Sequence, residues 1–301
     1  MTKVILRFTL TLGLILLTQN SRAWDAEGHR IIAAATWREL PASTQKHITQ
    51  ILLGHPAYAD WKKAFSQGPR DLDLPLYAFL KASTWPDEIR RQGGNYDFPK
   101  WHYINHPLRS PKFRKEPVPQ NDTILAGIAQ CERDLPERKM PGEVRAVALS
   151  WLIHLVGDLH QPLHCVSLYK REFPQGDDGG TRFWIKPGTR PVSLHEIWDE
   201  LLGTSNNPRL AMNEAILITA RYPRNTLREL KSATTPAAWS LEGRALALEQ
   251  VYRRGKLRGG PIPETAVPLP TGYTKSAKNV AERQAALASH RLCDELSRLL
   301  K

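Results

Sequence analysis

Residues 142–164 read GEVRAVALSWLIHLVGDLHQPLH. Nearly every side chain in 146–156 is apolar, which predicts a helix buried on almost all sides in the centre of the fold. Pro162 disfavours helical geometry in the residue before it. We therefore expect this helix to span 142–161 and to end near Gln161.

The main polar exceptions in this apolar segment are His154 and Asp158. Residues four apart share one face of a helix, so both side chains can reach a single cation. His164 follows just beyond the expected end of the helix. Burying such groups is costly unless cations or polar partners satisfy them. The segment therefore predicts a metal site next to the core.

A second pair with the same spacing, His195 and Asp199, follows later in the chain. His29, Asp87 and His102 add further donors among otherwise apolar segments. A lone pair of this kind is more often a surface contact, but two pairs with additional imidazoles and a carboxylate indicate a multinuclear site. Nitrogen and oxygen donors without a CxxC motif suit zinc, although ligand type alone leaves manganese, iron and cobalt open.

The rest of the chain is mainly helical. A turn-rich segment, 166–198, contains the β-like run 181–185 and predicts a small hairpin near the metal site. Two polar, proline-marked segments, 107–120 and 256–273, are expected to be loops. We find no internal repeat, so 24–301 is expected to be one mainly α domain, a helical bundle. Helical periodicity also marks 27–40, 44–53, 121–135, 208–222, 234–252 and 276–300.

The first 23 residues resemble a secretory signal peptide. Lys3 and Arg7 precede an apolar run too short to cross a bilayer, and small residues end at Ala23. We expect cleavage there, so that the mature chain begins at Trp24 and is secreted or periplasmic without a membrane anchor.

The chain is basic. It carries 42 Lys and Arg against 30 Asp and Glu, and removing Lys3, Arg7 and Arg22 leaves 39 against 30, or +9. Such a charge steers polyanions toward the surface but says nothing about chemistry. The chain has 3 cysteines, too few for a disulfide scaffold; at most one bridge can form, and the sequence does not choose the pair.

Ordered pieces spanning most of 24–301 resemble the zinc-dependent single-strand nucleases of the S1/P1 type. HLVGDLHQPLH at 154–164 is especially close to the signature of that family. The other matching pieces are Trp24-x4-His29, Asp87-x-x-Arg90, WHYI at 101–104, DDGG at 177–180 and LHEIWD at 194–199.

The resemblance implies a phospholipase C/P1 nuclease-like fold and three Zn²⁺ per chain. It implies a secreted phosphodiesterase that cleaves single-stranded DNA and RNA to products with 5′-phosphates and also hydrolyses 3′-nucleotides. One zinc would be held by His29 and by the α-amine and carbonyl of Trp24. The α-amine becomes available as a ligand only after the signal peptide is cleaved. Asp158 would bridge this zinc to a second one. The remaining ligands would be Asp87, His102 and His154 for the second zinc, and His164, His195 and Asp199 for the third.

The resemblance also assigns roles around the metals. Arg90 would stabilise the charge of the transition state, and Tyr103 would stack an unpaired base. Asn105 stands where many members of the family have an acidic residue, and Thr181 stands where the family usually has Asn. Both positions lie near the nucleotide in relatives, so base preference and pH optimum stay open.

Two other functions are compatible with these donors. Zinc-dependent phospholipases C share an N-terminal Trp ligand, but the spacing Trp24-x4-His29 and the final Asp199 favour the nuclease. A non-catalytic secreted zinc-binding protein would have closed four-ligand sites, whereas the expected sites have open positions. We expect no stable protein partner and a monomer. His160 and His106 are expected to lie outside the ligand set.

Overall fold

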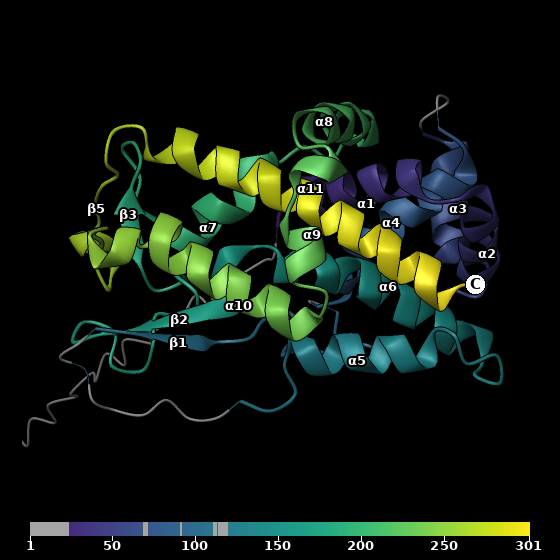
Figure 1. Ribbon diagram of the computed structural model, residues 1–301, viewed down its shortest axis with the longest axis horizontal. Coiled ribbons are helices and arrows are strands. Elements are labelled where there is room, and N and C mark those ends of the chain that lie inside the picture. The colour runs from purple at the N-terminus through teal and green to yellow at the C-terminus, as the bar shows by residue number, and fades with distance from the viewer. Residues whose placement is uncertain (1–23, 69–71, 91, 111–112, 114–119) are drawn as a thin grey trace, which may run out of the picture.

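Helix α6, Gly142–Leu159, runs through the centre of the molecule (Figure 1). Every side chain from Ala146 to its end is buried, including the polar ones of His154 and Asp158. The helix stops because Gln161 takes the extended backbone that a following proline favours. The predicted central helix is therefore confirmed, with its end two residues earlier than expected.

The computed structural model describes residues 24–68, 72–90, 92–110, 113 and 120–301. The predicted signal peptide, 1–23, and most of 111–119 lie outside the described residues. Among the described helices, none combines the length and apolar character needed to cross a membrane.

The predicted mainly α class is confirmed. Six of the described helices make the main contacts with α6, and they form the bundle that surrounds it in Figure 1. They are α1 (Ala26–Glu39), α2 (Ala42–Leu52), α4 (Leu74–Ile89), α5 (Ile124–Asp134), α10 (Pro236–Leu246) and α11 (Tyr273–Leu299). The others are α3 (Tyr58–Ser66), α7 (Leu194–Asp199), α8 (Pro208–Arg221) and α9 (Glu229–Ser232).

Among the helices that the sequence did not predict are α3 and α4. Helix α4 contains Pro86 near its end, and proline inside a helix normally removes a hydrogen bond and breaks the pattern. Asp73 caps the start of α4 by accepting a hydrogen bond from the Leu76 amide at 2.8 Å. Helix α4 carries Asp87. Because the helix was not predicted, the sequence did not indicate which element positions this residue.

The strands are few and short. The predicted hairpin corresponds to β3 (Trp184–Lys186) and β4 (Val192–Ser193), which pair antiparallel. β5 (Val267–Pro268) pairs with β3, and β1 (His106–Arg109) pairs in parallel with β2 (Val166–Tyr169). The expectation that 107–120 and 256–273 are only loops was therefore wrong at β1 and β5. Both strands are too short to show a clear alternation of apolar and polar residues.

The three cysteines, Cys131, Cys165 and Cys293, are buried and free. The Cys165 thiol donates to the Leu159 carbonyl at 3.3 Å, at the end of α6. Burial raises the pKa of each thiol. The one bridge that the sequence allowed is not formed.

Candidate metal centre

The last two turns of α6 present His154 and Asp158 on one face. Nε2 of His154 lies 3.2 Å from Oδ2 of Asp158, and both side chains are fully buried. Asp87 from α4 and His102 from the following loop approach the same point. Nδ1 of His102 is 3.0 Å from Oδ2 of Asp158, and Oδ1 of Asp87 is 3.8 Å from Nε2 of His154. Four residues expected around one zinc therefore converge.

On the other side of His154 lies His29 of α1. The two imidazole rings stack with centroids 4.0 Å apart, and Nε2 of His29 lies 3.2 Å from Oδ1 of Asp158. Oδ1 of Asp158 thus faces His29, whereas its Oδ2 faces His102 and His154. Trp24, at the start of the described chain, is buried, and its indole donates to the Gly157 carbonyl at 3.0 Å.

A third group forms where η1 (Pro162–Cys165) meets α7. Ser193 caps α7 by accepting a hydrogen bond from the Glu196 amide at 3.0 Å, which fixes the first turn of that helix. Nε2 of His195 lies 3.1 Å from Nε2 of His164 and 3.3 Å from Oδ2 of Asp199. Nδ1 of His164 is 4.0 Å from Oδ2 of Asp158, so this group borders the other two.

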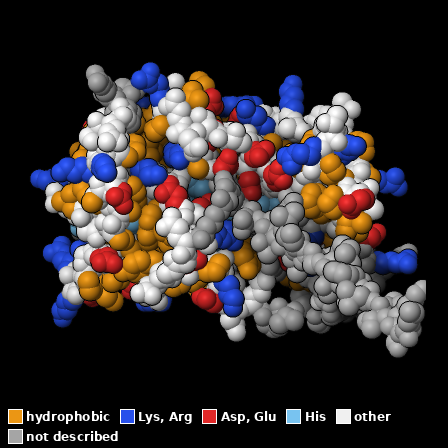
Figure 2. All heavy atoms as spheres, turned by 180° about the vertical axis from the view of Figure 1, so that it is seen from behind, with side chains coloured by type: hydrophobic (Ala, Val, Ile, Leu, Met, Phe, Trp, Pro, Cys, Tyr) orange, Lys and Arg blue, Asp and Glu red, His pale blue; other side chains and the backbone are white. Residues whose placement is uncertain are grey.

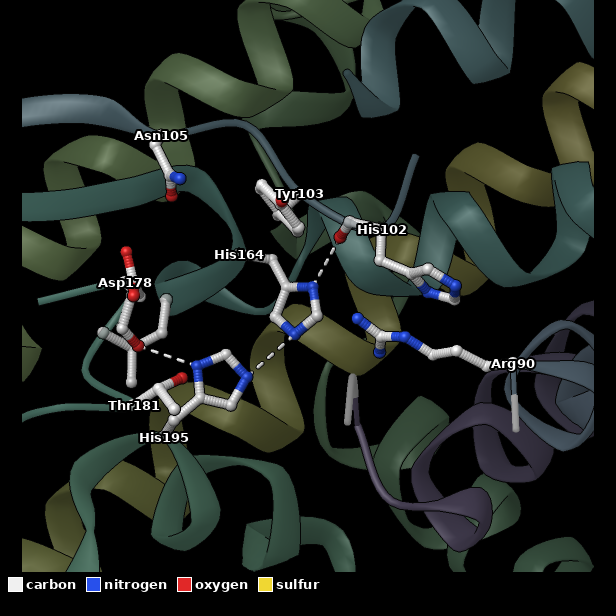
Figure 3. A pocket seen from close by; sticks show the side chains of 10 residues that line it. Arg90, His102, Tyr103, Asn105, His164, Asp178, Thr181 and His195 are labelled. Atoms are coloured by element: carbon white, nitrogen blue, oxygen red, sulfur yellow. Dashed lines mark hydrogen bonds between the residues drawn. The ribbon is translucent and has the colours of Figure 1, made fainter. Parts of the chain in front are cut away.

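The hydrogen bonds made by the second nitrogens fix the tautomers. Nδ1 of His164 lies 2.6 Å from the His102 carbonyl, and Nδ1 of His195 lies 2.7 Å from the Gly179 carbonyl (Figure 3). A carbonyl only accepts, so both Nδ1 atoms carry the proton. In the neutral rings both Nε2 atoms then present lone pairs to each other, which is repulsive unless a cation lies between them. Metal-binding histidines have this arrangement.

His154 follows the same rule. Its Nδ1 lies 2.9 Å from the Ser83 carbonyl, so its Nε2 faces the carboxylates of Asp158 and Asp87. Burial would lower the pKa of His154, but Asp158 and Asp87 outweigh burial and raise the pKa to about 9. A proton on this ring is one way to place positive charge between the carboxylates, and a divalent cation is another.

The pKa values of two buried aspartates of the centre, Asp158 and Asp199, are shifted in opposite directions. Burial opposes ionisation of Asp158, but His154 and His102 hold its pKa well below the usual range. Burial raises the pKa of Asp199 well above the usual range, with Asp158 adding to the effect and Gln161 opposing it. Asp199 is therefore the carboxylate with most need of a nearby cation.

Several donor atoms in the centre are buried without a hydrogen-bond partner in the described part of the chain. They are both ring nitrogens of His29, Nε2 of His102, Oδ1 of Asp87 and Oδ1 of Asp158. Burying a polar atom without a partner is energetically costly, and a cation bound between these atoms would satisfy them. The donor set contains imidazole and carboxylate only, which fits zinc.

The donors form three groups in which the candidate atoms lie within 4.8 Å of one another. They are His29 with His154 and Asp158, Asp87 with His102 and His154, and His164 with His195 and Asp199. The predicted grouping differs around two residues: His154 falls in both of the first two groups, and Asp158, expected in both, falls in the first alone. In Figure 2, histidine side chains are visible near the middle of one face with acidic side chains gathered beside them.

A pocket of about 340 Å³ opens on the third group. Arg90, at the end of α4, points into it, whereas Asn105 and Thr181 line the opposite side (Figure 3). Tyr103 also lines this pocket and a neighbouring one of about 320 Å³. The structure therefore brings the four residues expected around the substrate to the rim of the donor groups.

The sequence matches a known family. The match to the S1/P1 nucleases covers residues 24–301 of this chain. The chain belongs to the S1/P1 nuclease family. It is 27% identical to Endonuclease 4 of Arabidopsis thaliana over 97% of this chain and 94% of that protein. It is 25% identical to Endonuclease 2 of the same plant over 63% of this chain and 59% of that protein.

As an S1/P1 nuclease the chain is a hydrolase of phosphoric ester bonds with nucleic acid as its substrate class, and its family is in general zinc-dependent. The predicted family and the nuclease class are thus confirmed.

Sequence reasoning missed Gln161, which supports the third group. Its Nε2 donates to Oδ1 of Asp199 at 2.7 Å, and its Oε1 accepts from the Leu163 amide at 2.6 Å. The position of Gln161 directly before Pro162 signalled the turn but not the contact with Asp199, which is 38 residues away.

His160 and His106 point away from the donor groups, as expected. Nε2 of His160 accepts from the buried Arg291 at 2.9 Å, and Nε2 of His106 lies 2.9 Å from the Ser240 hydroxyl. Burial and Arg291 lower the pKa of His160 to about 3, which keeps the ring neutral.

Proposed function

We propose that residues 24–301 form a secreted, zinc-dependent phosphodiesterase that cleaves single-stranded DNA and RNA to products with 5′-phosphates and also hydrolyses 3′-nucleotides. The observation that carries the zinc dependence is the pair of imidazoles whose Nε2 lone pairs face each other at 3.1 Å, on His164 and His195. Membership in the S1/P1 nuclease family supports the phosphodiesterase.

Three zinc ions would be bound by the convergent donors. His29 would hold one of them together with the α-amine and carbonyl of Trp24, once the chain begins at that residue. Asp158 would bridge to a second, because its two oxygens face different histidine groups. The second zinc would also take Asp87, His102 and His154, and the third would take His164, His195 and Asp199.

The chemistry divides between the ions and the side chains. When bound, zinc lowers the pKa of water and stabilises negative charge on phosphate oxygens. The three aspartates of the site return only half of the positive charge of three divalent ions, and the surplus suits an anionic ester. Arg90 would bind a non-bridging oxygen from the side opposite Thr181.

The preference for single strands would follow from Tyr103. A side chain that stacks on a base requires that base to be unpaired, and stacking contributes about 1–3 kcal/mol per base. Tyr103 lies between two pockets, so a base on either side has access to its ring. Asn105 and Thr181 face the nucleotide across the first pocket and would set base preference.

The family match favours the nuclease over the phospholipase C. The non-catalytic zinc-binding protein would need closed sites, whereas the third donor group opens on a pocket of about 340 Å³. Arg90 and three histidines line this pocket beside one carboxylate, that of Asp178, and this polar lining suits a phosphate ester.

The test uses protein that begins at Trp24 and a matched precursor that retains residues 1–23. Zinc content is measured by elemental analysis, and both proteins are given single-stranded DNA, double-stranded DNA, a 3′-nucleotide and phosphatidylcholine. We expect three zincs in the mature protein, preferential cleavage of single strands, and fewer zincs in the precursor.

Hydrolysis of phosphatidylcholine without cleavage of single-stranded DNA would support the phospholipase. Stoichiometric zinc binding without turnover of any ester would support the zinc-binding protein. Equal zinc content and activity in the precursor would exclude the α-amine of Trp24 as a ligand.

A further inference from the structure

A second pocket, of about 360 Å³, lies at the far end of the β1–β2 ribbon from the candidate metal centre. Helix α10 runs alongside these strands (Figure 1) and supplies one wall. Four of the residues that line the pocket are basic, namely Arg109, Lys170, Arg244 and Arg254, and most of the others are apolar: Leu108, Leu168, Leu248, Tyr252 and Leu257.

The same two strands connect the two pockets. Asn105, directly before β1, lines the first pocket and Leu108 of β1 lines the second. On the neighbouring segment, His164 of η1 lines the first pocket and Leu168 of β2 lines the second. The three residues of extended chain from Asn105 to Leu108 span about 10 Å. Strands β1 and β2 pair in register from His106 with Val166, so both connections run in the same direction.

The charge of the second pocket is one-sided. No carboxylate is among its described lining residues. Arg254 pairs with Glu249 at 2.5 Å and Lys170 lies 3.9 Å from Glu172, both acids standing outside the lining. Arg244 donates to the Pro107 carbonyl at 3.3 Å, which holds its guanidinium against β1. Basic groups that follow the phosphate backbone are one feature of sites that bind a single strand. The apolar walls offer a surface to the sugar and base.

The backbone that carries Arg254 is strained. Arg253 and Arg254 have φ values of 50° and 55°, and Gly255 follows at 79°. Non-glycine residues in this left-handed region cost about 1 kcal/mol or more each, and they persist where the surrounding structure requires them. The strain brings Arg254 to the edge of the pocket and thus argues that its position matters.

We propose that this pocket binds a nucleotide of the same single strand that is cut at the candidate metal centre, a few nucleotides away from the cleaved bond. The inference rests on the proposed function. A span of about 10 Å corresponds to about three nucleotides of a stacked strand, and to fewer of an extended one. Lys170 and Arg254 neutralise backbone phosphates, and the leucine side chains contact the sugar and base.

The experiment compares the mature enzyme with Arg254→Gln and with the double variant Lys170→Gln/Arg254→Gln. Arg221→Gln is the matched control, because Arg221 on α8 is also an exposed arginine paired with a glutamate. Values of kcat/KM are measured on a single-stranded 12-mer and on a 3′-nucleotide at several salt concentrations. Binding of the 12-mer is measured separately by fluorescence anisotropy, and thermal unfolding verifies the fold of each variant.

We expect the double variant to lose about tenfold in kcat/KM on the 12-mer and nothing on the 3′-nucleotide. Each lost phosphate contact should reduce the slope of log(kcat/KM) against log[salt] by about 0.7. An equal loss on both substrates, no loss on either, or the same loss in Arg221→Gln would overturn the proposal. A chain that binds the 12-mer through these residues but hydrolyses no ester would refute the proposed function while supporting the pocket.

Discussion

Gly157 on α6 and His29 on α1 lie so close that a Cβ at residue 157 would be 2.9 Å from Nδ1 of His29. The Gly157 carbonyl also accepts the indole proton of Trp24 at 3.0 Å. A single residue without a side chain therefore lets two helices meet and holds Trp24 and His29, two of the three residues expected to bind the first zinc, in place. Gly142, in the first turn of the same helix, has nothing within 4 Å of an added Cβ.

Gly157→Ala is expected to lower zinc content and activity, because the methyl group would displace the His29 ring. Alanine favours a helix over glycine by about 1 kcal/mol, so a loss of function would not stem from helix propensity. Gly142→Ala is the matched control and should keep full zinc content. Isothermal titration with zinc, paired with elemental analysis, measures the difference. Equal zinc affinity in both variants would show that the close approach is not needed for binding.

Asp158→Asn is expected to reduce hydrolysis by more than about 100-fold, the upper end for residues that only orient ligands. The amide nitrogen cannot bind a cation, and the two histidine groups would lose their shared carboxylate. Elemental analysis should show the loss of at least one zinc per chain. Asp134→Asn, on the surface of α5, serves as control. Full activity in Asp158→Asn would exclude a bridging role.

Local spacing made a large part of the site predictable. His154 and Asp158, like His195 and Asp199, are four residues apart, and helical geometry alone places each pair on one face. Pro162 likewise fixed the end of α6 to within two residues. Both features depend on the geometry of a single helical turn, and residue spacing is enough to predict that geometry.

The contacts between distant segments were not predictable in the same way. The parallel pairing of β1 with β2 joins residues sixty positions apart, and each strand has only 4 residues, too few for a periodic signal. Helix α4 was missed because Pro86 interrupts its pattern, although the chain tolerates it there. Convergence of the donors depends on such packing, so the sequence could supply candidate ligands but not their distances.

Gln161→Leu is expected to weaken zinc binding at the third group by about 10–100-fold, the usual effect of removing a group that orients a ligand. Gln161 both orients Asp199 and caps the turn that carries His164. Gln130→Leu, which removes a surface amide paired with Asp134, is the control. Competition with a zinc-binding dye measures the affinities. Unchanged affinity in Gln161→Leu would mean that Asp199 keeps its orientation without help.

Glu242→Gln is expected to lower the free energy of unfolding by about 3 kcal/mol, because it leaves a buried guanidinium without its countercharge. Arg291 is 3% exposed and pairs with Glu242 at 2.7 Å, while it also donates to His160 behind the metal helix. Glu249→Gln breaks an exposed pair and should change the free energy by about 0.5 kcal/mol or less. Urea unfolding measures both. Arg291 also donates to the carbonyls of Glu229 at 3.3 Å and Ala233 at 3.2 Å. Similarly small effects in both variants would show that these carbonyls satisfy the guanidinium without Glu242.

Asp177 should make stability depend on pH in an unusual direction. Burial raises the pKa of this carboxyl from 3.8 to about 6, although Leu168 and Tyr252 donate hydrogen bonds to it. Between these two values the folded chain binds the proton more tightly than the unfolded chain does. The contribution of Asp177 to the free energy of unfolding therefore falls as pH rises through this window and stays low above it.

Asp177→Asn removes this titration and keeps an acceptor for the Leu168 amide. We expect the variant to gain up to about 3 kcal/mol relative to the parent between pH 4 and pH 6.5, from a pKa shift of about two units. Urea unfolding across this range measures the difference, and taking the difference at each pH cancels the titration of all other groups. Asp60→Asn, on the surface of α3, should run parallel to the parent. A flat difference for Asp177→Asn would mean that the Tyr252 hydroxyl compensates the burial of the charge.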